Sequence, residues 1–164
     1  MMDEIKANVK DWTSEGQLAD YLRKIVNKQA GNGSGLIYGM GHAVYTLSDP
    51  RAAILKQKAQ EMAAKKGRMD EFNLYALLEE VSPEILCEKM GVKKAICANI
   101  DLYSGFVYQM LDIPPELYTP LFAVARIVGW CSHRIEEVLT NGKIIRPAFK
   151  SVCERKDYIL MDDR

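Results

Sequence analysis

The 164-residue sequence has only 4 cysteines and 2 histidines, and its charges show no surplus of either sign. Cys87, Cys97, Cys131 and Cys153 form no C-x-x-C pair, so no structural zinc or other metal site is expected. Lysine plus arginine and aspartate plus glutamate both number 22, so the basic surplus typical of nucleic-acid-binding proteins is missing. No apolar run approaches the roughly 18 residues of a membrane-spanning helix, and the N-terminus lacks the apolar core of a signal peptide. We therefore expect a cytoplasmic protein with reduced thiols that binds neither nucleic acid nor membrane.

Strand-like alternation of apolar and polar residues persists nowhere, and neither repeats nor low-complexity segments occur. Apolar residues recur instead at helical spacing. Ser14 and Gln17 form a capping box that predicts a helix through Ile25. The Asp-Pro pair at 49–50 predicts another helix, which Gly67 ends. With 48% hydrophobic residues available for a core, the chain is expected to adopt an all-α fold.

Prolines divide the second half of the sequence. The helical pattern of 72–81 is expected to stop at Ser-Pro-Glu, 82–84, which then opens a short helix that Gly91 closes. The double proline at 114–115 is the best candidate for a domain boundary. The strongest helical pattern follows it, from 121 to 139.

The stretch LIYGMGHAVYTLSDPR, residues 36–51, sets one of the two histidines beside glycines. Gly39 and Gly41 remove side chains there, so a ligand could approach the backbone closely. A lone histidine such as His42 is more often structural than catalytic. Arg51, in the first turn of the following helix, reads by itself as a surface charge. The stretch is therefore either a turn or a site.

Four further residues could carry chemistry. Asp101 ends an apolar run and either caps the helix that begins near Leu102 or acts as a general base, and an ionised carboxylate serves both roles. Arg126 lies within the apolar segment LFAVARIVGW and needs an anionic partner or an outlet to solvent. Arg146 precedes a proline in an extended segment that could reach a neighbouring subunit. His133, among polar neighbours, reads as a surface or interface residue.

Four motifs, GMGHAVYTLSDPR, NIDLYSG, ARIVGWCSH and IIRPAF, follow one another in this order. Together they closely resemble the C-terminal part of citrate synthase, over roughly residues 1–150. The resemblance implies an all-helical homodimer in which 1–112 form the small domain and 113–164 the C-terminal piece of the large domain. It implies the condensation of acetyl-CoA with oxaloacetate to citrate and coenzyme A, a step of the tricarboxylic acid cycle, with coenzyme A as substrate and no permanently bound cofactor.

The resemblance also implies a role for each candidate. His42 matches the histidine that polarises the oxaloacetate carbonyl, and Asp101 matches the base that takes a proton from the acetyl methyl group. Arg51 and Arg126 match arginines that bind oxaloacetate carboxylates, as planar guanidinium groups do by paired hydrogen bonds. Arg146 matches an arginine contributed across the dimer. The loop expected to contact coenzyme A includes Leu36, Gly39, Met40 and Gly41.

Two departures from the family pattern affect these expectations. Family members usually carry a basic residue for a coenzyme A phosphate four positions after this histidine, where this chain has Thr46. The family's other catalytic histidine lies in an HGGAN-like motif just upstream of the matched region, and most of the large domain also precedes it. We therefore expect a fragment with little turnover. The apolar positions of the 121–139 helix are expected to be exposed, which favours self-association.

Two other functions stay open. A 2-methylcitrate synthase would use propionyl-CoA through the same residues, because discrimination of acyl length lies in pocket shape. A catalytically idle helical module would bind coenzyme A or mediate assembly. The missing histidine and Thr46 favour that module for the chain by itself.

Overall fold

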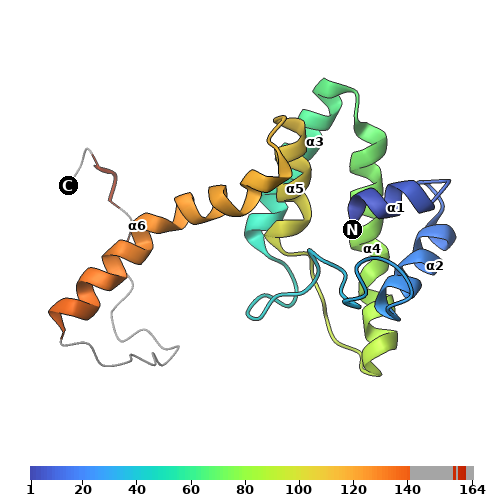
Figure 1. The fold of residues 1–164 in the computed structure, drawn as a ribbon, viewed down its shortest axis with the longest axis horizontal. Helices are drawn as coiled ribbons and strands as arrows, with labels where there is room; N and C mark the ends of the chain where they lie inside the picture. The colour runs from blue at the N-terminus through green and yellow to red at the C-terminus, as the bar shows by residue number, and fades with distance from the viewer. Residues whose placement is uncertain (141–156, 158, 162–164) are drawn as a thin grey trace. The chain divides into compact units, whose positions relative to one another are not determined.

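The computed structural model describes residues 1–140, 157 and 159–161. Their secondary structure is helical, with a single antiparallel bridge between Met40 and Ala98 and no strand among the described residues. None of their helices is long and apolar enough to cross a membrane. The elements are α1 (Met2–Asn8), α2 (Glu15–Val26), α3 (Pro50–Lys66), α4 (Met69–Met90), α5 (Ile100–Met110), the short 3-10 helix η1 (Pro115–Leu117) and α6 (Tyr118–Leu139) (Figure 1). The prediction of an all-α fold is confirmed.

The predicted caps of α2 and α3 are present. The Ser14 hydroxyl accepts the backbone N–H of Gln17 at 3.3 Å. The Asp49 carboxylate accepts the backbone N–H of Arg51 at 3.0 Å. Gly67 ends α3 in the left-handed conformation, with φ of 66°. These residues supply hydrogen bonds that the helix ends would otherwise lack.

Helix α4 corrects the prediction of a break at 82–84. It runs unbroken from Met69 to Met90 with Pro83 inside it, and only its end at Gly91 is as predicted. Proline in a helix interior costs about 3 kcal/mol, chiefly because one backbone hydrogen bond is lost. Side chains of α4 on both sides of the proline, including those of Leu78 and Ile85, are buried in the core. This packing holds the two halves of α4 in line.

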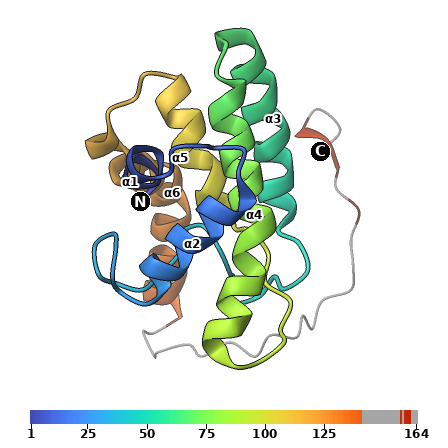
Figure 2. The ribbon, with the colours of Figure 1, turned by 90° about the vertical axis from the view of Figure 1, so that its right-hand side faces the viewer.

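Contacts divide the chain into two compact units, Met1–Leu121 and Phe122–Arg164. In the first unit α3 packs along α5 and also against α4, while α2 packs along α4 and α1 contacts α2 (Figures 1 and 2). Aromatic rings from α4 and α5 meet in the core, with centroids 4.8–6.5 Å apart. These rings belong to Phe72, Tyr75, Tyr103 and Phe106. The core thus fixes the start of α5 against α3.

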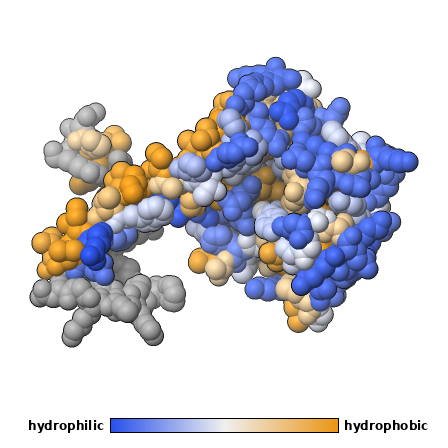
Figure 3. Space-filling view, viewed as in Figure 1, coloured by the Kyte–Doolittle hydropathy of each residue, from blue (hydrophilic) through white to orange (hydrophobic). Residues whose placement is uncertain are grey.

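Helix α6 differs from the other long helices because none of its residues is buried. It begins three residues before the predicted start, with Pro120 in its first turn, where a missing N–H removes no helical bond. Its apolar side chains are visible along the helix in Figure 3, and they include Val124 at 68% and Val128 at 73% exposed. The predicted exposure of this helix is therefore found. Arg146 lies outside the described residues.

Candidate functional site

The loop that carries His42 is tied to the residues just before α5. The backbone N–H of Gly41 donates to the Cys97 carbonyl, and the N–H of Asn99 donates to the Gly39 carbonyl, both at 2.8 Å. These two bonds form the bridge between Met40 and Ala98. The loop is therefore paired with a segment about 58 residues further along the chain.

The two glycines of this loop serve different purposes. Both have positive φ, 89° for Gly39 and 85° for Gly41. A Cβ atom on Gly39 would lie 2.7 Å from the Cα of Leu102, so the space that this glycine leaves is filled by α5 of the same chain. A Cβ on Gly41 would meet nothing closer than 4.0 Å. Room for a ligand beside the backbone, which the sequence suggested at both glycines, exists only at Gly41.

His42 is held in one orientation by its own turn. Its Nδ1 atom accepts the backbone N–H groups of Val44 at 3.0 Å and Tyr45 at 3.2 Å. Two donors require a lone pair at Nδ1, so the proton of the neutral ring sits on Nε2. The Tyr45 ring packs on the imidazole with centroids 4.9 Å apart. His42 thereby presents an Nε2–H donor on its free edge.

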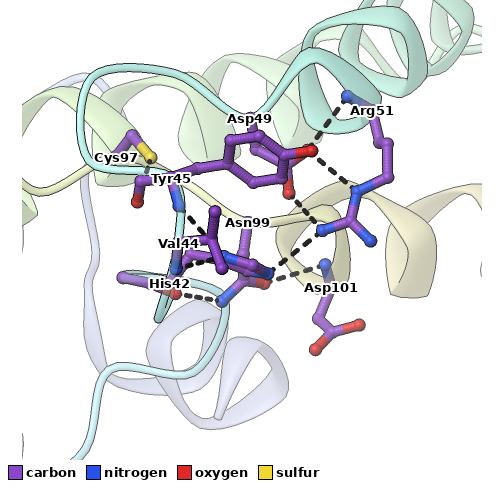
Figure 4. A network of polar contacts seen from close by, with 9 residues as sticks. His42, Val44, Tyr45, Asp49, Arg51, Cys97, Asn99 and Asp101 are labelled. Atoms are coloured by element: carbon purple, nitrogen blue, oxygen red, sulfur yellow. Dashed lines mark hydrogen bonds and ion pairs between the residues drawn. The ribbon is translucent and has the colours of Figure 1, made fainter. Parts of the chain in front are cut away.

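Arg51 stands beside that donor. Its Nη2 lies 3.2 Å from Nε2 of His42 (Figure 4). Two N–H groups cannot both point along the line between these nitrogens. An oxygen atom placed against both groups would instead accept a hydrogen bond from each. Carbonyl and carboxylate groups both supply such an oxygen.

Asp49 holds Arg51 in this position. The Asp49 carboxylate is buried and accepts Arg51 Nε at 3.0 Å and Nη2 at 2.8 Å. These hydrogen bonds lower the pKa of Asp49 to about 2, since they stabilise its charged form. The same pairing raises the pKa of Arg51. The guanidinium is thus charged and oriented, and its Nη1 group has no partner among the described residues.

Asp101 lies in the first turn of α5 and does not cap it. The cap is Asn99, whose side-chain oxygen accepts the backbone N–H of Asp101 at 2.9 Å. The capping role considered for Asp101 is therefore wrong. Its carboxylate is exposed and has no hydrogen-bond or ion-pair partner within the described part of the chain. It is near enough to Arg51 to contribute to the raised pKa of that arginine.

The structure thus brings His42, Arg51 and Asp101 together in the first unit (Figure 4). Arg126 belongs to the second unit, where its guanidinium lies over the Phe122 ring at 4.2 Å. His133 is on the surface of α6, with its imidazole 85% exposed, in agreement with the surface interpretation.

Other candidates lie in the loop itself. Leu36 is 56% exposed, Met40 is half-buried and Thr46 is exposed. No group of three potential metal ligands occurs among the residues that the structure describes.

Two residues with clear roles in this cluster were missed by sequence reasoning. Asp49 was identified only as a helix cap, although an aspartate two residues before an arginine is a recognisable signal. Asn99 was not singled out at all. Its only signal is its place two residues before Asp101, at the start of a helix.

Comparison with known proteins gives a consistent result. The family model for the citrate synthase C-terminal domain matches residues 1–148. Citrate synthase of Synechocystis sp. is 39% identical over 164 residues, 99% of this chain and 38% of that protein. Citrate synthase of Deinococcus radiodurans is 40% identical over 129 residues, 78% of this chain and 33% of that protein.

Solved structures agree. A citrate synthase of Thermoplasma acidophilum, in ternary complex with carboxymethyl coenzyme A and oxaloacetate, has a TM-score of 0.67 and 28% identity, covering 99% of this chain and 40% of that one. Citrate synthase of Thermotoga maritima has a TM-score of 0.62 and 32% identity, covering 99% and 42%. The chain therefore spans about two-fifths of the length of these relatives, and by sequence and fold alike it belongs to the citrate synthase family.

Proposed function

We propose that this chain carries part of a citrate synthase active site, and that the complete enzyme condenses acetyl-CoA with oxaloacetate to give citrate and coenzyme A. The observation that supports this most directly is the grouping of His42, Arg51 and Asp101, in which Arg51 contacts His42 and lies near enough to Asp101 to interact electrostatically with it. A hydrogen-bond donor, a fixed guanidinium and an unpaired carboxylate are three of the groups that this reaction requires. The Thermoplasma acidophilum relative was solved with oxaloacetate and a coenzyme A derivative.

Oxaloacetate binds against His42 and Arg51. Its keto oxygen accepts the Nε2–H of His42, and one of its carboxylates accepts hydrogen bonds from the free side of the Arg51 guanidinium. The keto oxygen becomes an alkoxide as the new carbon–carbon bond forms. A donor aimed at developing negative charge contributes on the order of 10²–10³ in rate.

Asp101 takes a proton from the acetyl methyl group of acetyl-CoA. The electron pair left on that carbon attacks the keto carbon of oxaloacetate, and the resulting alkoxide takes up a proton. Water then hydrolyses the citryl thioester, which releases citrate and coenzyme A. A base must be able to reach the proton that it removes, and the exposed carboxylate of Asp101, which has no partner among the described residues, supports this role. Such a base contributes typically ~10²–10⁴-fold.

The charge of this cluster explains why further arginines are needed. The cluster contains one guanidinium, that of Arg51, and two acidic side chains, those of Asp49 and Asp101. Oxaloacetate is a dianion, so additional cations must stabilise it. We assign this role to Arg126 and to Arg146, the latter from the second subunit of a homodimer, with 1–112 as the small domain and 113–164 as part of the large domain.

Coenzyme A is a substrate in this proposal. The segment from Leu36 to Gly41 contacts its adenine end, and the neutral Thr46 leaves its phosphates less tightly held than a basic residue would. The 164 residues alone have little turnover, because they correspond to 38% of the Synechocystis protein. We place the complete enzyme in the cytoplasm.

A chimera tests the proposal. This chain replaces the matching part of the Synechocystis sp. citrate synthase, to which it is 39% identical, and the release of coenzyme A from acetyl-CoA is measured with and without oxaloacetate. Asp101→Asn should lower kcat by ~10²-fold or more while the chimera stays folded. A control variant, Asp70→Asn, changes an acidic residue at the start of α4 and should leave kcat unaltered. An active chimera that tolerates Asp101→Asn would exclude Asp101 as the base.

A second experiment tests the alternative of a catalytically idle module that binds coenzyme A. The 164-residue chain is titrated with coenzyme A and with oxaloacetate while its amide NMR signals are followed. Shifts confined to the 36–51 loop and the start of α5 on adding oxaloacetate support the proposal. Binding of coenzyme A alone would favour the idle binding module.

A further inference from the structure

The side chain of Asn99 joins the two parts of the proposed catalytic cluster. Its Oδ1 accepts the backbone N–H of Asp101 at 2.9 Å, and its Nδ2 donates to the carbonyl of Gly41 at 2.8 Å. Asp101 carries the proposed base, and Gly41 precedes His42. One amide group therefore bonds to the backbone of both catalytic segments at once.

Both ends of this amide are specified by their partners. The N–H of Asp101 is a donor and needs an oxygen, whereas the Gly41 carbonyl is an acceptor and needs an N–H. A flipped amide would set a donor against a donor and an acceptor against an acceptor. Only asparagine, with one donor end and one acceptor end at this length, satisfies the two contacts together.

Other contacts also fix the loop against the start of α5. The N–H of Asn99 also donates to the Gly39 carbonyl at 2.8 Å, and the Cβ position of Gly39 is 2.7 Å from the backbone of Leu102. The loop thus presses directly on the first turn of α5. The Asn99 side chain adds a hydrogen bond to Gly41, the residue directly before His42.

We propose that Asn99 is a positioning residue that fixes the His42 imidazole relative to the Asp101 carboxylate. It acts by orienting the peptide between Gly41 and His42, from which the turn that holds Nδ1 of His42 begins. Asn99 touches neither substrate nor reacting atoms in this role. The catalytic meaning rests on the proposed function, but the positioning itself is a property of the free chain.

Two substitutions separate positioning from helix capping. Serine and aspartate are N-caps about as good as asparagine. Asn99→Ser keeps the cap but is too short to reach the Gly41 carbonyl. Asn99→Asp keeps size and cap but turns an oxygen toward that carbonyl, which replaces attraction with repulsion. Ser14→Ala, which removes the cap bond of α2, is the control for loss of a cap elsewhere.

The readout is the imidazole ring of His42 in the 164-residue chain. The chain has 2 histidines, so ¹⁵N NMR of the rings resolves His42, and the exposed His133 is an internal reference. The wild-type ring should show the Nε2–H form, with slow amide exchange at Val44 and Tyr45. Asn99→Ser should mix the two tautomers and speed that exchange about fivefold, and Asn99→Asp should do so more strongly. His133 should not change.

These outcomes decide the proposal. If the His42 ring and the amide exchange at Val44 and Tyr45 are the same with asparagine, serine or aspartate at position 99, asparagine there is only a cap and the proposal is overturned. The same holds if Ser14→Ala disturbs His42 as much as Asn99→Ser does. Thermal unfolding shows whether each variant is folded, and if Asn99→Asp does not fold, Asn99→Ser and Ser14→Ala suffice.

Oxaloacetate binding connects positioning with function. Asn99→Ser should weaken oxaloacetate binding about fivefold, as expected for one lost hydrogen bond. If wild-type chain binds no oxaloacetate but its His42 ring responds to Asn99→Ser, the positioning role stands and the proposed function fails for this chain. If oxaloacetate binds and the ring does not respond, the reverse holds.

Discussion

The segment 36–51, a loop that runs into the first turn of α3, and helix α6 each contain one histidine and one proposed substrate-binding arginine, but these side chains are held differently. In the loop, backbone donors hold His42 and a buried carboxylate holds Arg51. In α6, His133 and Arg126 are exposed, and Arg126 contacts only a phenylalanine of its own helix among the described residues. The side chains of the loop are thus held by contacts within the first unit, whereas no hydrogen bond to another described side chain orients Arg126.

The difference follows from how far each segment packs against the rest of its unit. The loop is paired with the residues before α5, and α5 packs on α3 within the core. Helix α6 has an apolar surface but buries none of its residues. Polar groups are oriented where packing and hydrogen bonds leave one arrangement, and the first unit provides both for the loop.

The largest effect should come from Gly39→Ala. Its Cβ would meet the backbone of Leu102 at 2.7 Å, and a residue with φ of 89° is strained in any case. We expect the free energy of unfolding to fall by about 3 kcal/mol, measured by urea denaturation. Gly33→Ala is the matched control, because Gly33 has φ of 72° but nothing within 4 Å, and it should cost only about 1 kcal/mol. Equal losses would show that the loop is not pressed against α5.

The exposed apolar side chains of α6 should cause the chain to self-associate. Val124 and Val128 lie one turn apart and are 68% and 73% exposed. Replacing both by glutamate should raise the dissociation constant of a self-associated form at least a hundredfold, because each buried valine contributes about 1.5 kcal/mol and every chain carries both substitutions. Sedimentation equilibrium measures this, with Leu47→Glu, in the loop and 86% exposed, as the control. A wild-type chain that is monomeric at high concentration would refute the expectation.

Local signals in the sequence were enough for most of the fold. Helix caps depend on a few adjacent residues, so Ser14, Asp49 and Gly67 marked helix ends correctly. The break expected at Pro83 was wrong because tertiary packing on both sides of the proline outweighs its local cost. No local pattern reports that packing.

The candidate site was only partly accessible from sequence. The resemblance pointed to His42, Arg51 and Asp101, which the structure brings together. The contact of Gly39 with Leu102 and the double bonding of Asn99 depend on residues about 60 positions apart meeting in space. Pairing at that separation leaves no periodic trace, so the two glycines looked alike and Asn99 looked unremarkable.

Acid should destabilise the first unit before α6 is affected. The pKa of Glu71 is lowered to about 2 from 4.5, first because Arg68 donates hydrogen bonds to it and also because Lys6 of α1 pairs with it. A carboxylate with a lowered pKa stabilises the fold fully above its ordinary pKa, and this contribution is lost as pH falls from about 4.5 to about 2. With partial exposure taken into account, it is on the order of 2 kcal/mol.

In Glu71→Gln the free energy of unfolding should therefore fall less between pH 4.5 and pH 2 than in the wild type. The measurement is urea denaturation at several pH values in a Trp130→Phe background, where Trp12 reports on the first unit alone. Glu61→Gln is the control, since Glu61 forms an ion pair with Lys58 on the surface of α3. Asp49 has the same low pKa and should keep part of the acid sensitivity in the variant. If Glu71→Gln and wild type lose stability equally, the α1–α4 ion pair does not stabilise the first unit.

The smallest expected effect is a difference between Arg51→Lys and Arg126→Lys in oxaloacetate binding. Lysine keeps the charge but lacks the planar fork that Asp49 holds, so Arg51→Lys should weaken oxaloacetate binding about tenfold, or about 1.4 kcal/mol. In the 164-residue chain Arg126→Lys should change this affinity less than twofold, because Arg126 has no oriented partner among the described residues beyond Phe122. In the chimera with the Synechocystis sp. enzyme, which supplies the remaining length, both substitutions should weaken binding. NMR titration of the chain and the KM for oxaloacetate of the chimera give the two comparisons. An equal effect of both substitutions in the chain alone would mean that α6 is already oriented for binding, and the contrast between the two regions would not hold.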